Sequence, residues 1–276
     1  MVPLLLIAPC LFLYVALFVW PQIELLAQGF VDRDGVSLVH YTRFFSDSYN
    51  LNILLQTLLL GFVVTAITLV FGVPSAYLLA RMESRWAPTL LMIATIPLLI
   101  SVVVRSFGWM VLFFRNGVVS QFVVWMGVAE PSYQLMYTLT GVSIALAQVL
   151  LPIMIITLYG VFRSISVDLE YAATSLGATP TVTFFLVTLR LARDGMIAGS
   201  MLVFALAIST YATPSLIGGA RVKVMATSIY EQSVELLDWP FAAALSTILL
   251  IAVVILAATS AALIARQDTK EKPDAR

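Results

Sequence analysis

The sequence predicts an all-α integral membrane protein with six transmembrane helices. Of its 276 residues, 61% are hydrophobic and only 11% are charged, whereas a soluble domain carries about 25% charged residues. The apolar residues form runs of about 20 or more, which is the length that crosses a bilayer. Acidic and basic residues cancel to a net charge of zero, so nothing indicates nucleic acid as a partner. The lipid bilayer is the predicted environment.

The apolar runs place the spans within one transmembrane domain, 1–276. The first run lacks the basic start and small-residue cleavage site of a signal peptide, so we expect it to be retained as a span. Charges and glycines within 110–136 indicate a segment lying across the membrane surface. We also expect a loop at 161–195 and a charged tail at 266–276. The expected spans are 4–26, 51–80, 89–109, 137–160, 196–217 and 240–265.

The basic residues predict the orientation of these spans. Nine Lys and Arg fall on the side of the 81–88 loop, the 161–195 loop and both termini, and six fall on the other side. Because cytoplasmic loops are enriched in Lys and Arg, we expect the first side to be cytoplasmic.

A polar, small-residue stretch at 168–178 interrupts the apolar sequence. Asp168 and Glu170 would place negative charge in the first turn of a short helix, where the helix dipole favours it. Gly177 can adopt the left-handed conformation that ends a helix. Thr179 and Pro180 are suited to cap and begin the next helix.

This stretch resembles the EAA loop of permease subunits of binding-protein-dependent ABC importers. The resemblance rests on Glu170, Ala172 and Ala173, followed by Gly177 and Ala178. It implies a type I importer permease fold in the bacterial inner membrane, with these five residues in a cytoplasmic coupling helix that docks on an ATPase. Arg190 and Arg193 stand where that family commonly has prolines.

The resemblance also implies the partners. They are a second homologous permease, two ATPase subunits that bind ATP and Mg²⁺, and a periplasmic or surface-exposed substrate-binding protein. The chain itself would hold no cofactor. Its lysines, at 223, 270 and 272, are not followed by Ser or Thr, so it contains no phosphate-binding GxxxxGK[ST] loop.

Glu170 has two possible roles. It could pair with a basic residue of the ATPase and transmit movement to the spans. Alternatively, it could stabilise only its own helix dipole, by roughly 0.3 to 1 kcal/mol.

A second resemblance concerns the substrate. The segment from Pro97 through Arg105 to Trp109, together with Leu151-Pro152 and Asp238-Trp239-Pro240, is similar to the spermidine/putrescine permease group, particularly its B-type subunit. Relatives with this pattern carry polyamines, ferric iron, opines or other small solutes. Arg105 could be an interface anchor beside Trp109, or it could serve the pathway or a structural ion pair.

Prolines within spans favour broken helices, which often line translocation pathways. Polar side chains near them could therefore face the solute, or could bond to their own helix backbone and allow close packing. The pathway candidates are Arg105, Trp109, Gln148, Tyr159, Ser209, Thr210 and Tyr211.

Catalysis and metal binding find no support in the sequence. With one Cys and one His, neither a multi-cysteine metal site nor a His cluster can form. We therefore expect a non-catalytic subunit. A secondary transporter working alone is the rival, but it would need ionisable residues buried in the spans.

Overall fold

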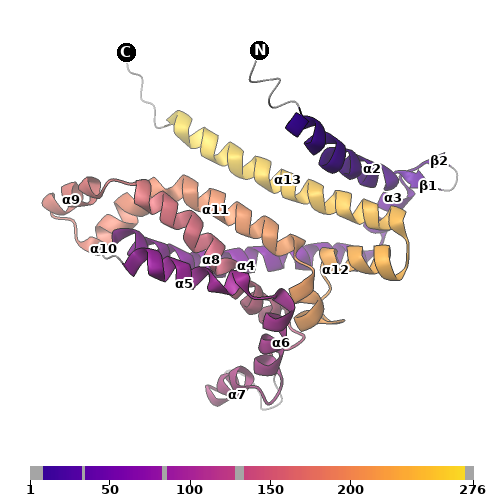
Figure 1. The fold of residues 1–276 in the computed structure, drawn as a ribbon, viewed down its shortest axis with the longest axis horizontal. Coiled ribbons are helices and arrows are strands. Elements are labelled where there is room, and N and C mark those ends of the chain that lie inside the picture. Colours follow the sequence, from indigo (N-terminus) through magenta and orange to yellow (C-terminus); the bar gives the residue numbers. More distant parts are fainter. Residues whose placement is uncertain (1–8, 33–34, 83–85, 128–133, 271–276) are drawn as a thin grey trace. The chain divides into compact units, whose positions relative to one another are not determined.

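The computed structural model describes residues 9–32, 35–82, 86–127 and 134–270, and Figure 1 shows them as helices joined by short connections. Six helical segments are long and apolar enough to cross a membrane, as the sequence predicted. The segments are Pro9–Gln28, Ser48–Arg81, Val102–Trp125, Leu139–Ser164, Pro180–Ser209 and Trp239–Ser260. The chain divides into two compact units, Met1–Gln56 with Val224–Ile255 and Thr57–Lys223 with Leu256–Arg276.

The first unit is built from two sequence segments and contains a small hairpin and several short helices. In the hairpin, Val31 lies opposite Val36. The unit also contains the start of α4 and of α13. Its elements are η1 (Val15–Val19), α2 (Trp20–Gln28), β1 (Val31–Asp32), β2 (Gly35–Val36), α3 (Val39–Ser46), α12 (Met225–Tyr230), η4 (Glu231–Glu235) and α13 (Trp239–Lys270).

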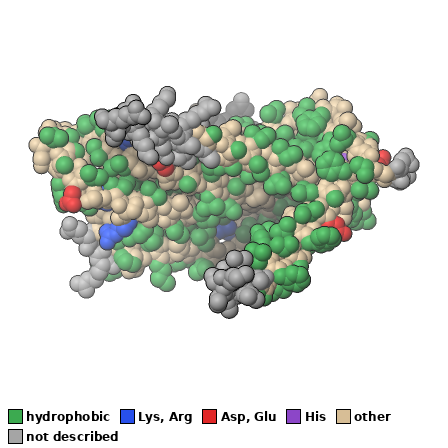
Figure 2. Space-filling model, turned by 90° about the horizontal axis from the view of Figure 1, so that it is seen from above, with side chains coloured by type: hydrophobic (Ala, Val, Ile, Leu, Met, Phe, Trp, Pro, Cys, Tyr) green, Lys and Arg blue, Asp and Glu red, His purple; other side chains and the backbone are tan. Residues whose placement is uncertain are grey.

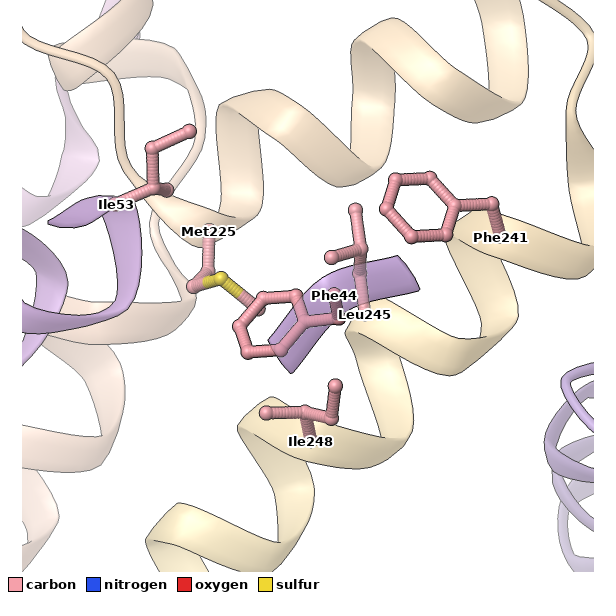
Figure 3. Close-up of a cluster of buried hydrophobic side chains, with 6 residues drawn as sticks. All are labelled: Phe44, Ile53, Met225, Phe241, Leu245 and Ile248. Carbon is pink, nitrogen blue, oxygen red and sulfur yellow. The ribbon is translucent and has the colours of Figure 1, made fainter. Parts of the chain in front are cut away.

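The core of this unit is apolar and comes from four helices. Figure 3 shows the Phe44 ring of α3 beside the Met225 side chain of α12, with Leu245 and Ile248 of α13 next to them. Phe44 and Met225 are fully buried. Burial of such side chains contributes about 1.5 to 3 kcal/mol each, so this cluster holds the short helices on α13.

The second unit is a helical bundle that carries the stretch singled out in the sequence. Figure 1 shows α8 and α11 side by side within it. Its elements are α4 (Ser48–Arg81), α5 (Trp86–Leu99), α6 (Val102–Phe113), α7 (Val118–Trp125), α8 (Leu139–Ser164), α9 (Val167–Ser175), α10 (Pro180–Thr183), η2 (Phe184–Thr188), α11 (Leu189–Ser209) and η3 (Pro214–Gly218).

Glycines allow these helices to approach closely. A side chain at Gly195 of α11 would collide with Val161 of α8, and one at Gly61 of α4 would collide with Phe204 of α11. Small residues at such crossings permit the van der Waals packing that holds helices together in lipid.

The outward faces remain apolar, and Figure 2 shows hydrophobic side chains over much of the face in view, with few charged ones.

The third expected span, 89–109, is divided in the structure. Helix α5 ends at Leu99, the backbone is extended at Ser101 (ψ 131°), and α6 begins at Val102. Pro97 lies inside α5, which continues past it to Leu99, and a proline disturbs the turn before it, so Pro97 does not account for the break that follows. The segment predicted to lie on the surface, 110–136, contains the end of α6 and all of α7. Its first part instead belongs to the candidate span Val102–Trp125, which contradicts the surface prediction there. Its residues Glu130 and Pro131 lie outside the described ranges.

The fifth span is displaced from its expected position, 196–217. Helices α10, η2 and α11 form one segment, Pro180–Ser209, so the loop predicted at 161–195 is largely helical. Arg190 and Arg193 depressed the apparent hydrophobicity of its first half, although long arginine side chains can reach the membrane edge from within a span. The segment ends where Thr210 turns to extended backbone (ψ 124°).

Replacing glycine with alanine should have opposite effects on the free energy of unfolding at two positions of α8. An alanine Cβ at Gly141 would overlap the Leu135 carbonyl oxygen, whereas at Gly160 it would meet nothing within 4 Å. We expect Gly141→Ala to lower the free energy of unfolding by about 1 to 3 kcal/mol through overpacking. Gly160→Ala should raise it by up to about 1 kcal/mol, because alanine favours a helix interior. Unfolding of the purified chain in denaturant measures both, and equal effects would contradict the packing at Gly141.

Candidate functional site

The start of α9 is fixed by its own side chains. The Ser166 hydroxyl accepts a hydrogen bond from the Asp168 backbone N–H at 3.2 Å and donates one to the Asp168 carboxylate at 3.0 Å. Asp168 and Glu170 lie in the first turn, as predicted. Because the first N–H groups of a helix lack partners within it, these oxygens stabilise its beginning.

The end of α9 is equally well defined. Gly177 has a φ of 89°, which is the left-handed conformation expected from the sequence. The Gly177 N–H donates to the Thr174 carbonyl and the Ala178 N–H to the Ala173 carbonyl, at 3.0 and 3.1 Å. This is the Schellman pattern of helix termination. The next helix begins as predicted, with the Thr179 side chain accepting from the Val182 N–H.

Glu170 is the anchor of α9. Its Oε1 accepts hydrogen bonds from Arg81 Nη2 at 2.8 Å, Arg81 Nε at 3.0 Å and Thr188 Oγ1 at 2.8 Å, and its Oε2 accepts one from the Tyr77 hydroxyl at 3.3 Å. The side chains of Arg81 and Glu170 are only 14% and 12% exposed. A carboxylate that accepts two bonds from one guanidinium makes a strong, oriented contact.

Arg81 joins this anchor to the neighbouring helix ends. Its Nη1 donates to the carbonyls of Phe162 and Ile165 at 3.0 and 3.2 Å, at the end of α8. In the opposite direction, Arg163 Nη1 of α8 donates to the Ala80 carbonyl of α4 at 3.2 Å. The Ile165 and Ala80 carbonyls lie at helix ends, where such groups lack partners within the helix, and the Phe162 carbonyl also accepts from the Ile165 N–H. The ends of α4 and α8 and the beginning of α9 are therefore tied together.

The environment of Glu170 favours its charged form. Burial by itself would raise the pKa of Glu170, but the hydrogen bonds from Arg81 and Thr188 and the positive charge of Arg81 outweigh burial and hold the pKa below its usual range. We expected this carboxylate to pair with a basic residue of an ATPase. In the structure it pairs with Arg81 of the same chain, so the side of α9 open to a partner is a different one.

That open side consists of apolar and small side chains. Leu176 is 90% exposed, Tyr171 62% and Leu169 46%. Ala172 is exposed as well, while Ala173 and Ala178 are half-buried. Exposed leucines beside alanine give a surface on which another protein's backbone can approach closely, and such patches commonly mark interaction sites.

Two of the pathway candidates are brought together. Trp109 Nε1 of α6 donates to Gln148 Oε1 of α8 at 3.4 Å, and the Trp109 ring lies 4.8 Å from that of Phe113. Arg105 of α6 instead points back toward α5, where its Nη1 donates to the Pro97 carbonyl. The interface, pathway and ion-pair roles considered for Arg105 stay predictions.

The remaining candidates lie elsewhere. Ser209 and Thr210 donate to the Leu206 carbonyl at 3.2 and 2.7 Å, which is the helix-capping alternative to a pathway role. Tyr159 and Tyr211 are half-buried. Among the described residues, no group of three or more His, Cys, Asp or Glu is placed to hold a metal ion.

Arg81, Tyr77 and Thr188 belong to the site but were not predicted from the sequence. Tyr77 and Arg81 are four residues apart on α4 and so share a face. This spacing was the sequence signal that could have indicated that they act together. Arg81 and Glu170 are separated by 89 residues in the sequence. A pattern within one helix does not predict a contact across that separation.

Relatives of known kind cover most of this chain. No protein-family profile matches it. It is 31% identical over 246 residues to the spermidine/putrescine transport system permease protein PotB of Escherichia coli (strain K12), covering 86% of this chain and 89% of that protein. It is 30% identical over 192 residues to the molybdenum transport system permease protein ModB of Mycobacterium bovis, covering 70% and 71%.

Solved structures show the same fold at low sequence identity. A chain of a bacterial alginate ABC transporter, in complex with an alginate pentasaccharide-bound periplasmic protein, superposes with a TM-score of 0.72 at 17% identity, covering 92% of this chain and 91% of that one. A chain of the MetNI methionine ABC transporter, in inward-facing conformations, gives a TM-score of 0.61 at 17% identity, covering 80% and 98%. The permease fold predicted from the sequence is thus confirmed.

Proposed function

The chain belongs to the PotB family of ABC importer permeases, and we propose that it passes a polyamine such as spermidine or putrescine across the inner membrane. It is a multi-pass inner-membrane subunit of a transport system. The polyamine assignment rests on the similarity to PotB. The observation that carries the role in an ATP-driven importer is α9, a short helix with an exposed apolar side and a buried ionic anchor.

The anchor suggests how α9 acts. Because Glu170 binds Arg81 of α4 and Thr188 of η2, a displacement of α9 pulls directly on two membrane-spanning segments. ATP and Mg²⁺ would be bound by a separate ATPase docked on the exposed side of α9. Closure of that ATPase would then bias the spans between two arrangements, as nucleotide does in rigid-body transitions.

The assembly and orientation follow from the same proposal. Two ATPases would lie on the cytoplasmic side with both termini of this chain, and a second, homologous permease would lie beside it. A periplasmic binding protein would dock on the opposite side and supply most of the solute specificity. The superposable alginate transporter chain comes from a complex with a periplasmic protein, which supports a partner of that kind.

A polyamine is a polycation, and the pair of Trp109 and Gln148 suits one. An indole face attracts cations, and an amide oxygen accepts hydrogen bonds from ammonium groups. The similarity to ModB makes molybdate the informative competitor. Uptake of labelled spermidine that excess putrescine suppresses, and that molybdate and ferric iron leave unchanged, would support a polyamine over these solutes.

Charging the open side of α9 should separate docking from folding. We expect Leu176→Glu to abolish co-purification of the ATPase and ATP-dependent uptake while the unfolding midpoint stays unchanged, because this side chain is 90% exposed. The matched control is Leu236→Glu, 61% exposed in the first unit, which should keep the ATPase. Pull-down of the tagged chain from detergent measures both. Wild-type protein that purifies alone and transports without ATP would favour the secondary transporter.

A further inference from the structure

An apolar cavity of about 290 Å³ lies in the second unit, among α4, α11 and the part of α13 from Leu256 onward, which belongs to that unit. This is close to the lower end of ligand-sized pockets, roughly 300 to 1,000 Å³. Two of its hydroxyls are already satisfied, because Thr65 donates to the Gly61 carbonyl and Ser260 to the Leu256 carbonyl. Its large apolar lining residues are Phe62, Leu69, Met196, Met201, Phe204 and Leu256.

Arg193 is the charged residue among those that line this cavity. Its Nε is buried and makes no hydrogen bond, although it forms an ion pair with the Asp194 carboxylate at 3.5 Å. A buried charged donor without a hydrogen-bond partner is costly. An oxyanion at this position would remove that cost with a charge-assisted hydrogen bond, and the guanidinium fork matches phosphate geometry.

Arg193 lies at the edge of the bundle, whereas the cavity extends inward. The next residue but one, Gly195, packs on Val161, close to Arg163 at the end of α8, which in turn contacts Ala80 at the end of α4. Phe204 lies 204 − 193 = 11 residues further along α11, or about 16 Å at 1.5 Å per residue. The cavity therefore runs from a cationic end, near the ends of α4 and α8, along α11 to apolar residues such as Phe204.

A second hollow extends the cationic end outward. It has a volume of about 410 Å³, is lined by Arg193, Asp194 and Arg190, and also touches Leu169 of α9. Arg190 and Arg193 are three residues apart and so share a face of α11.

We propose that an anionic phospholipid binds here, with an acyl chain in the cavity and its phosphate on the guanidinium of Arg193. The apolar lining matches an acyl chain, and basic pockets between membrane helices suit anionic headgroups. A polyamine is excluded as the occupant because Arg193 would repel it. The bound lipid would bridge α4, α11 and α13 next to the segment that anchors α9. Lipid binding at this site requires that the chain lie in a membrane and does not depend on the solute.

Lipid binding to the purified chain, with whatever subunits accompany it, tests the proposal. Each of two lipids, dioleoyl phosphatidylglycerol and dioleoyl phosphatidylcholine, would be titrated into the protein, and native mass spectrometry would measure how much binds. We expect the first lipid to bind wild-type protein about tenfold more tightly than it binds Arg193→Gln, the effect of about 1.4 kcal/mol. Arg115→Gln, the same change at an exposed arginine between α6 and α7, should match wild type.

A second variant tests the cavity without touching the charge. Ser200→Phe would fill the space beside Met201, so it should reduce binding of both lipids while Arg193 remains. This variant also decides the case if Arg193→Gln fails to fold. Equal binding of the two lipids to wild-type protein, or unchanged binding to Ser200→Phe, would overturn the proposal. Loss of the ATPase in the pull-down would leave these readouts unaffected, so the two proposals fail separately.

Discussion

Glu170→Ala is expected to lower the free energy of unfolding by about 3 kcal/mol, a cost typical of unpairing a buried charge. The substitution would leave the Arg81 guanidinium largely buried without its carboxylate, and it would remove the acceptor for Thr188 and Tyr77. Denaturant unfolding of the purified chain measures the loss. Uptake should fall as well, because α9 would lose its attachment to α4.

Asp168→Ala is the matched control for this experiment. Asp168 lies in the same first turn but is exposed and contacts Ser166. If Glu170 stabilised only the helix dipole, both substitutions would cost a similar amount, about 0.3 to 1 kcal/mol. A double-mutant cycle with Arg81→Met then isolates the coupling between the two side chains. A coupling energy near zero would contradict the ion pair.

The pH dependence of the same pair has a definite sign. Because the pKa of Glu170 in the folded chain is below the ordinary 4.5, the unfolded chain binds more protons in the interval between the two values. The stabilisation is therefore complete above about pH 4.5 and is lost as the pH falls through the folded pKa. Glu170→Gln cannot titrate at this position, so the difference between it and wild type should shrink as the solution is acidified through that interval.

Local chemistry was predictable from the sequence, and long-range pairing was not. The first-turn acids of α9, the left-handed Gly177 and the Thr179 cap each depend on neighbouring residues, and the structure contains all three. The partner of Glu170 comes from the far end of α4. Its identity depends on how the helices pack, which periodicity within one helix does not specify.

The span boundaries show a related limit. Hydropathy located six spans because backbone groups in lipid require long apolar helices. It misplaced 196–217 because Arg190 and Arg193 lie within a helix that is continuous from Pro180. It also treated 89–109 as one helix, although the chain breaks between Leu99 and Val102. In both cases individual side chains, rather than average hydrophobicity, determine where a helix begins or ends.

Arg105→Met should lower the free energy of unfolding by about 2 kcal/mol, because it leaves a carbonyl without a donor. The Arg105 guanidinium donates to the Pro97 carbonyl in the last turn of α5, where carbonyls have no partner within the helix. A positive charge near a helix C-terminus is also favourable. Arg105 thus caps the end of α5 beside the break at Ser101. Thermal and denaturant unfolding of the purified chain measure the effect.

Arg105→Lys and Arg115→Met distinguish this cap from a pathway role. Lysine keeps a donor and the charge, so Arg105→Lys should recover most of the lost stability, although without the guanidinium geometry. Arg115→Met removes an exposed arginine and should leave stability within about 0.5 kcal/mol of wild type. If Arg105→Met instead unfolds like wild type but transports poorly, Arg105 serves the solute. The break at Ser101 would then need another source of stability, since the carbonyls at the end of α5 lie in a segment where lipid offers no hydrogen bonds.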